Sequence, residues 1–232
     1  MGNKTIVHLT GMFSRKYGAF EHYLLNVARV CKDRGYRTVL QYESTPTSAA
    51  YLSELEGLDA GVVGMATHTH ALQGVRCVAA MLRATRPEIV HTHFVSGYVL
   101  LAVPFIARWL GVRKVIAGGY SVPTLRPFSV RRFALNRYDH VLVDAQAITD
   151  RLIGAGVKPG VVSTHYLGLF GRRETSQTVR AHLRREFGIP DEALVLGCLA
   201  FDNPIKGLDV LLYALSQVVR VRPDVHLIVV GV

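Results

Sequence analysis

The sequence predicts an α/β fold, with one complete domain built on a parallel sheet and the opening of a second domain after it. Three observations lead to this prediction. Short β-branched apolar segments alternate with helical segments along most of the chain. A polar break follows, and the alternation then restarts with an apolar, a helical and a second apolar segment. Strands that alternate with helices form parallel sheets covered by helices on both faces.

The first β-α-β unit spans residues 4–43. Strand "KTIVHLT" is followed by a loop and by helix "AFEHYLLNVARVCKDRG". Phe20, Leu24 and Ala28 recur at the spacing that places them on one face of this helix. Gly35 suits the left-handed position at the helix end, and strand "YRTVLQYE" comes directly after it.

The remaining elements of the first domain continue this alternation. The predicted strands cover residues 60–66, 88–94, 113–121, 140–145 and 160–168, and the predicted helices cover 71–87, 96–111, 130–139 and 146–156. Pro104 falls inside the second of these helices and predicts a kink there.

The restart after the polar break predicts a second domain. Two apolar strands, 194–201 and 224–232, flank a helix over 207–223. That helix has an apolar face suited to packing on a sheet, made of Leu208, Leu211, Leu212, Leu215, Val218 and Val219. The predicted division of the chain is a Rossmann-like domain over 1–170, a linker over 171–183 and an incomplete second domain over 184–232.

Composition narrows the class of partner. Half of the 232 residues are hydrophobic, enough for one core and part of a second. The 27 Lys and Arg residues against 17 Asp and Glu favour anionic partners, either nucleotide phosphates or an acidic membrane surface. Because like charges form no long run and no basic tail, we expect no nucleic-acid partner. The three cysteines fit no disulfide or zinc pattern, which predicts a cytoplasmic location. Peripheral contact of the protein with the inner face of the membrane is left open.

The loop after the first strand is a candidate ligand site, because parallel α/β sheets bind ligands at the carboxyl ends of their strands. It delivers Gly18 to the start of a helix, where unpaired N–H groups and the helix dipole attract anions. Gly18 is therefore a candidate phosphate contact, and the alternative is that it only ends a loop. The sequence contains no GxGxxG dinucleotide motif.

A second candidate anion site precedes the helix of the second domain. Lys206 and Gly207 stand at its start, where a cation opposes the helix dipole unless an anion binds. A lysine there is a flexible point charge suited to a diphosphate. The alternative is a solvated lysine in a turn.

Four histidines form two pairs, and each pair shares one face because its members lie two residues apart. His91 and His93 end a strand, and His68 and His70 lie in a more polar stretch. No acidic cluster accompanies the pairs, and the sequence does not bring them together. We therefore expect histidines that line a polar cleft and no metal site. Motifs for nucleophilic catalysis are absent, so no catalytic residue is assigned.

The order of these segments resembles glycosyltransferase family 4, which has the GT-B fold. Its glycine loop and Glu-bearing helix resemble "KYGAFEHYLLNVARVCKDRGYRTVL", and its "VHxH" strand resembles "RPEIVHTHF". The segments "YDHVLVDAQAITDRL" and "YLGLF" are similar to its next strand-helix unit and its "nGvD" turn. Its lysine-glycine stretch resembles "FGIPDEALVLGCLAFDNPIKGLDVLLYALSQVVRVRPDVHLIVVGV".

The resemblance implies a retaining, metal-independent hexosyltransferase with two Rossmann-like domains. It would move a sugar from a nucleotide-diphosphate sugar, with no further cofactor, to an acceptor on the first domain. That acceptor is expected to be a carbohydrate, a small molecule or a lipid-linked molecule. Gly18, Lys206 and Gly207 would contact the diphosphate from the two domains. The candidates for lining the cleft are Ala19, Glu21, His91, His93, Tyr120 and Gly168.

The sequence also departs from the family pattern. Ala19 replaces a second glycine, Phe201 replaces an arginine, and Gly119 or Tyr120 replaces a histidine that commonly contacts the transferred sugar. The family's paired glutamates lie beyond Val232, so we expect a chain truncated within its C-terminal domain.

The competing interpretation is a non-catalytic fragment that retains only the acceptor domain. The uncovered strands of the second domain would then seek a complementing chain or a second copy. A basic surface around Arg126, Arg131, Arg132 and Arg137 would meet an anionic membrane, or would simply be a solvated helix face.

Overall fold

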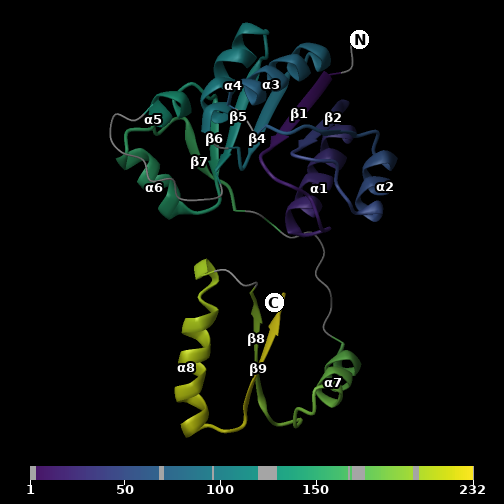
Figure 1. The fold of residues 1–232 in the computed structure, drawn as a ribbon, viewed down its shortest axis with the longest axis vertical. Helices are drawn as coiled ribbons and strands as arrows, with labels where there is room; N and C mark the ends of the chain where they lie inside the picture. The colour runs from purple at the N-terminus through teal and green to yellow at the C-terminus, as the bar shows by residue number, and fades with distance from the viewer. Residues whose placement is uncertain are drawn as a thin grey trace. The chain divides into compact units, whose positions relative to one another are not determined.

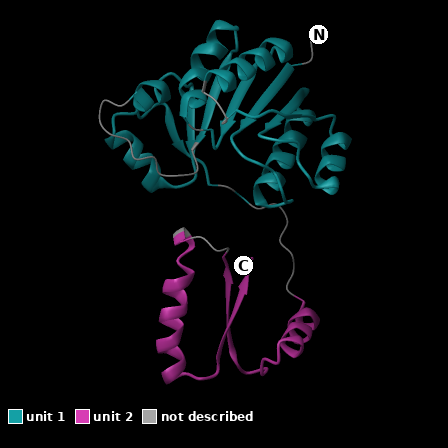
Figure 2. Cartoon of the chain, in the orientation of Figure 1, with its two compact units in different colours: residues 1–170 teal, residues 171–232 magenta. Residues whose placement is uncertain are grey.

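A computed structural model describes residues 4–67, 71–95, 97–119, 130–166, 168, 176–200 and 204–231. The chain divides into two compact units, Met1–Phe170 and Gly171–Val232 (Figure 2). Each unit has a parallel β-sheet of its own.

Unit 1 is built on a seven-stranded sheet with the strand order β3-β2-β1-β4-β5-β6-β7 (Figure 1). Every neighbouring pair is parallel. The strands are β1 (Lys4–Thr10), β2 (Tyr36–Tyr42), β3 (Gly61–Gly64), β4 (Ile89–His93), β5 (Lys114–Gly119), β6 (His140–Val143) and β7 (Val162–Thr164). The order reverses direction between β1 and β4, and such a switch point opens a crevice at the carboxyl ends of the strands.

Helices cover both faces of this sheet. They are α1 (Ala19–Asp33), α2 (Ala49–Gly57), α3 (Ala71–Thr85), α4 (Gly97–Trp109), α5 (Val130–Leu135) and α6 (Gln146–Gly154). On one face, Val7 and Val90 belong to a core with residues of α3 and α4. On the other face, Leu40 packs with Leu24 of α1 and Tyr51 of α2. Since side chains alternate along a strand, neighbours of Val7 and Val90 point toward the α1 face.

Two helices were not predicted from the sequence. Helix α2 begins after Ser48, whose side-chain oxygen accepts a hydrogen bond from the Tyr51 N–H at 3.3 Å. Helix α7 (Gln177–Glu186) overlaps residues 177–183 of the predicted linker, 171–183. Ser176 caps it in the same way, because its Oγ accepts from the Val179 N–H at 3.4 Å. Both helices start at a serine, the residue type that satisfies the first free amides of a helix.

Unit 2 consists of α7 and one β-α-β unit. Strands β8 (Leu194–Leu199) and β9 (Val225–Val230) pair in parallel, and α8 (Leu208–Val221) joins them after the short 3₁₀ turn η1 (Pro204–Lys206). In Figure 1, α8 runs beside this strand pair. None of its residues is buried. Within the described residues, every helix is too short or too polar to cross a bilayer.

Candidate functional site

The switch point of unit 1 brings the carboxyl ends of β1 and β4 together. Thr10 pairs with His93 in the sheet register. The Gly11 N–H donates to the His93 carbonyl oxygen at 2.8 Å, so the first residue after β1 is fixed against the last residue of β4. The loop that continues from Gly11 reaches α1 at Gly18.

Gly18 is the N-cap of α1, in extended backbone with φ −109° and ψ −166°. Ala19, the first residue of the helix, is exposed. The Gly18 N–H donates to Glu21 Oε2 at 3.0 Å, and the Ser14 hydroxyl donates to Glu21 Oε1 at 2.8 Å. The carboxyl group of Glu21, only 4% exposed, thus uses an amide that was expected to face a phosphate. Glu21 fixes the conformation of the loop through these two hydrogen bonds. Its negative charge also disfavours a phosphate beside Gly18.

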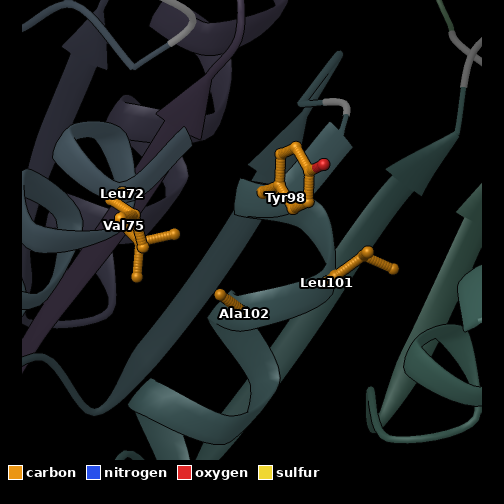
Figure 3. A pocket seen from close by; sticks show the side chains of 5 residues that line it. All are labelled: Leu72, Val75, Tyr98, Leu101 and Ala102. Carbon is orange, nitrogen blue, oxygen red and sulfur yellow. The ribbon is translucent and has the colours of Figure 1, made fainter. Parts of the chain in front are cut away.

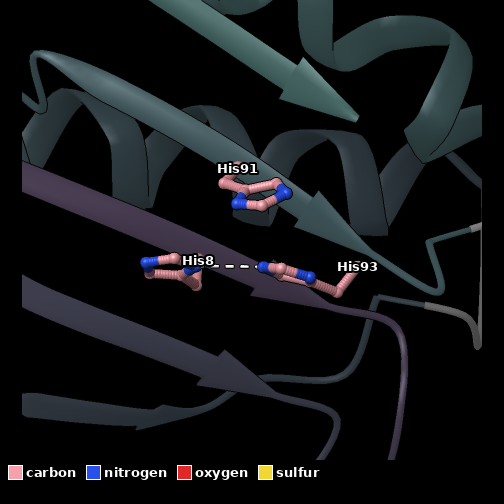
Figure 4. Close-up of side chains that lie close together, drawn as sticks. All are labelled: His8, His91 and His93. Atoms are coloured by element: carbon pink, nitrogen blue, oxygen red, sulfur yellow. Dashed lines mark hydrogen bonds between the residues drawn. The ribbon is translucent and has the colours of Figure 1, made fainter. Parts of the chain in front are cut away.

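His91 and His93 lie inside unit 1 with a third histidine, His8 of β1 (Figure 4). His8 pairs with His91 in the sheet register, and His93 follows two residues later on the same face. His8 Nδ1 and His93 Nε2 are 3.0 Å apart and hydrogen-bonded. The ring centroids of His91 and His93 are 3.9 Å apart. The exposed fractions are 2% for His8, 7% for His91 and 0% for His93.

These three histidines are held in the neutral form. Burial lowers the pKa of His8 to about 4. Burial also lowers the pKa of His91 well below its usual value, and repulsion from a protonated His8 or His165 would lower it further. The pKa of His93 falls for the same reason, with further contributions from His91 and His8. The other predicted pair, His68 and His70, lies outside the described residues.

Gly168 lines a pocket of about 300 Å³ between α1 and the segment after β7. The other lining residues are Tyr23, Asn26, Val27, Val30, Cys31, His165 and Tyr166. Tyr23 also presents its ring to His93, with the two centroids 6.0 Å apart. The pocket therefore borders the side chains that cover the histidine group. Tyr120 lies outside the described residues.

Lys206 and Gly207 stand at the start of α8, in unit 2. Lys206 is the exposed last residue of η1. Gly207 has φ 61°, in the left-handed region that favours glycine, and is the N-cap of α8. Its N–H donates to the Pro204 carbonyl at 3.1 Å, and its own carbonyl accepts from the Leu211 N–H at 3.0 Å. The turn thus begins a helix whose first amides have no partner within the helix, which is the arrangement that binds anions.

An apolar pocket of about 480 Å³ lies between α3 and α4 (Figure 3). Leu72 and Val75 of α3 line it, together with Tyr98, Leu101 and Ala102 of α4. Nothing in the sequence patterns singled out this pocket.

Arginines and aromatic rings also contact one another on α3, on α4 and at the end of α5. Arg83 of α3 lies over the ring of Trp109 of α4, with 5.6 Å between guanidinium and centroid. Phe105 of α4 stacks on Phe133 of α5 at 6.1 Å, and Arg137 lies over Phe133 at 4.8 Å. Trp109 is 74% exposed and Phe133 51%. We call these five residues the arginine–aromatic surface.

No protein-family model matches this chain. One curated relative, from Desulforudis audaxviator, is 27% identical over 193 residues. It is a UDP-N-acetylglucosamine–N-acetylmuramyl-(pentapeptide) pyrophosphoryl-undecaprenol N-acetylglucosamine transferase, and the match covers 82% of this chain. The chain spans only 46% of that relative, so less than half of its length is represented here.

Solved structures match nearly the whole chain. Anabaena HepE in complex with UDP-glucose matches with a TM-score of 0.69 and 20% identity, over 97% of this chain and 60% of its own. A glycosyltransferase from Rickettsia africae matches with a TM-score of 0.70 and 13% identity, over 99% and 69%. The UDP-GlcNAc 2-epimerase of Neisseria meningitidis matches less well, with a TM-score of 0.56 and 11% identity over 97% and 65%. At these identities the likeness shows the fold, and the predicted α/β, GT-B-like fold class is confirmed.

Proposed function

We propose that this chain is part of a glycosyltransferase that moves a sugar from a nucleotide-diphosphate sugar to an acceptor. Two comparisons support the transferase over other enzymes of this fold. The curated relative is an N-acetylglucosamine transferase, and one of the solved structures named above has UDP-glucose bound. The chain spans about half of the curated relative, so the proposal concerns the part of the enzyme that this chain contributes.

The observation that carries this proposal is the turn before α8. An exposed lysine, a left-handed glycine and the first amides of a 14-residue helix meet at Lys206 and Gly207. A diphosphate bound there would accept hydrogen bonds from the first amides of α8, and the charge of Lys206 would attract it as well. During transfer the same groups would stabilise the negative charge that grows on the leaving diphosphate.

We assign the main phosphate contacts to this turn and a lesser one to Gly18. The buried carboxyl group of Glu21 already accepts the Gly18 N–H, and a phosphate at that place would meet a like charge. Membership of family 4, retention of configuration and independence from metal ions are also part of the proposal. Their support is the resemblance of the sequence motifs.

We further propose that unit 1 binds the acceptor, and that the acceptor is lipid-linked. The curated relative has an undecaprenol-linked substrate in its name. The arginine–aromatic surface offers what a membrane surface requires, because Trp and Phe enter the interface while each arginine near anionic lipid contributes about 1 kcal/mol.

Calorimetry tests the donor site. UDP, UDP-glucose and UDP-N-acetylglucosamine are titrated into the wild-type chain, Lys206→Ala and a control, Lys158→Ala, that removes an exposed lysine of unit 1. We expect Lys206→Ala to weaken nucleotide binding about tenfold, as the loss of one charged hydrogen bond predicts, and Lys158→Ala to change little. Absence of heat with all three nucleotides, or equal binding by both variants, would contradict the proposal.

One observation favours a second candidate function, a module that requires a complementing chain. Helix α8 buries none of its residues, and Val221 and Tyr213 are 88% and 71% exposed. Light scattering during size-exclusion chromatography tests whether a second copy of this chain is the complementing chain. A mass that rises with concentration supports a module that associates through unit 2, and a monomer at every concentration excludes self-association.

A further inference from the structure

The buried histidines of unit 1 form a group that the proposed transfer reaction does not use. His8, His91 and His93 each offer one ring nitrogen, and these three atoms lie within 4.8 Å of one another. In Figure 4 the rings come from two neighbouring strands, β1 and β4, and converge on one side of the sheet. Their arrangement follows from the register, since residues paired in a parallel sheet project to the same face.

Ordinary hydrogen bonding does not satisfy this group. The bond between His8 Nδ1 and His93 Nε2 uses one nitrogen of each ring. Among the described residues, His91 Nε2 has no hydrogen-bond partner, although this atom is buried. An unsatisfied buried polar atom destabilises the folded state, and such atoms are rare in native proteins. A bound ligand would account for one here.

We propose that His8, His91 and His93 together bind one divalent transition-metal ion such as Zn²⁺ or Co²⁺. Two ligands of a tetrahedral zinc ion lie about 3.3 Å apart when each Zn–N bond is about 2.05 Å. The 3.0 Å between His8 Nδ1 and His93 Nε2 is close to that separation, and a small rotation of His91 completes the set. Three imidazoles leave the fourth position of the ion to water or an anion.

The chemistry of the group selects the kind of ion. Imidazole nitrogen suits Zn²⁺, Co²⁺ and Ni²⁺, whereas Mg²⁺ and Ca²⁺ require oxygen ligands. The group that the described residues form contains no carboxylate. Burial keeps all three rings neutral, which is the form that binds metal.

An ion also needs a way in. The pocket of about 300 Å³ beside α1 is lined by Tyr23 and His165. Tyr23 touches the ring of His93, and His165 is near enough to lower the pKa of His91. Tyr23 and Phe20 both pack against the His93 ring, so entry from this pocket would require these side chains to move. The bound ion would then join β1 to β4 directly beneath the switch point.

Cobalt titration tests the site on the whole chain after metal removal with a chelator. We expect one Co²⁺ per chain, with the visible bands of tetrahedral nitrogen coordination. His8→Gln and His91→Gln should each weaken binding at least about tenfold, because each removes one of three protein ligands. His182→Gln, on the exposed face of α7, and the double variant His68→Gln/His70→Gln are the controls and should bind as wild type does.

Thermal unfolding gives an independent readout that does not depend on how well the variants fold. At about 100 times its Kd, Zn²⁺ should raise the Tm of the wild-type chain by about 5 °C or more, and Mg²⁺ should not. Four results would overturn the proposal. The first two are the absence of saturable Co²⁺ binding, and equal Co²⁺ binding by the wild-type chain and by the His8→Gln and His91→Gln variants. The third is a thiolate-to-cobalt absorption band, which would place the ion on a cysteine. The fourth is a Tm shift with Mg²⁺ equal to the shift with Zn²⁺.

Discussion

Glu21 shows how a single buried side chain organises the first loop of unit 1. Its two carboxyl oxygens accept hydrogen bonds from Ser14 and Gly18, which lie four residues apart in the loop before α1. Glu21→Ala leaves both donors buried or half-buried without this acceptor. We expect it to lower the free energy of unfolding by about 2 to 3 kcal/mol.

Urea unfolding followed by circular dichroism measures this effect. The control is Glu56→Ala, which removes an exposed glutamate of α2 and should change stability by less than about 0.5 kcal/mol. Equal stability of the two variants would mean that the Glu21 contacts do not hold the loop.

Asp139 makes stability depend on pH. Burial acts to raise the pKa of this carboxyl group. Hydrogen bonds from the Val115 N–H and from Arg108, together with the charges of Arg108 and Lys114, outweigh burial and hold the pKa below its usual 3.8. Because the unfolded chain binds this proton more readily, the contribution of Asp139 is complete above the unfolded pKa and is lost as pH falls through the folded value.

Asp139→Asn should therefore flatten the loss of stability below about pH 4, and it should cost about 1 to 2 kcal/mol at pH 7. Urea unfolding from about pH 2.5 to 7 tests both effects, with Asp33→Asn, an exposed residue at the end of α1, as the control. If the free energies of unfolding of the wild-type chain and of the Asp139→Asn variant change in parallel down to the lowest pH, the contacts of Asp139 do not cause the pH dependence.

At the scale of elements, the strongly patterned segments were predictable and the weakly patterned ones were not. The β-branched run of β1 and the apolar face of α1 carry clear periods of two and of 3.6 residues. Helix α2, "AAYLSELEG", is short, and its burial depends on Tyr51 and Leu55 alone. Helix α7, "QTVRAHLRRE", is so polar that its composition indicates a linker. In both helices the capping serine was the signal that could have revealed them.

Helix α2 is fixed to β2 by a pair of tyrosines. The hydroxyls of Tyr42 and Tyr51 are 2.7 Å apart, and neither residue is exposed. Tyr51→Phe removes one partner and leaves the other hydroxyl buried, so we expect a loss of about 1 to 3 kcal/mol. Tyr42→Phe/Tyr51→Phe should recover part of that loss, because it leaves no unpaired hydroxyl. A double-mutant cycle by urea unfolding measures the coupling, and additive losses would show that the hydroxyls do not interact.

At the scale of the whole molecule, the candidate site depends on which strands lie side by side. The sequence placed His91 and His93 on one face, since their spacing is local. It did not associate them with His8, because His8 and His93 are 85 positions apart and become neighbours only when β1 pairs with β4. Glu21 was expected in the cleft, but its bond to Gly18 was not foreseen, since the conformation of the loop decides it. Local patterns therefore predicted that helices begin at Gly18 and Gly207, whereas the pairing of β1 with β4 determined the surroundings of His91 and His93.

The arginine–aromatic surface is the part of unit 1 that we expect to contact a membrane that holds a lipid-linked acceptor. Helix α4 contacts both α3, which carries Arg83, and α5, whose Phe133 lies under Arg137. Each positive charge near an anionic bilayer contributes about 1 kcal/mol, and salt screens this attraction. The chain should therefore sediment with vesicles that contain anionic lipid, and should do so less at high salt.

Arg83→Glu/Arg137→Glu tests this surface against a control with the same change in net charge, Arg180→Glu/Arg185→Glu on the exposed side of α7. We expect the first pair to weaken vesicle binding at least about tenfold, because two attractions of about 1 kcal/mol each become repulsions. The control should bind almost as well as wild type. If both pairs weaken binding equally, the attraction follows from the overall charge of +10 and not from the arginine–aromatic surface. If the wild-type chain binds neutral and anionic vesicles alike, the acceptor is reached without a charged membrane contact.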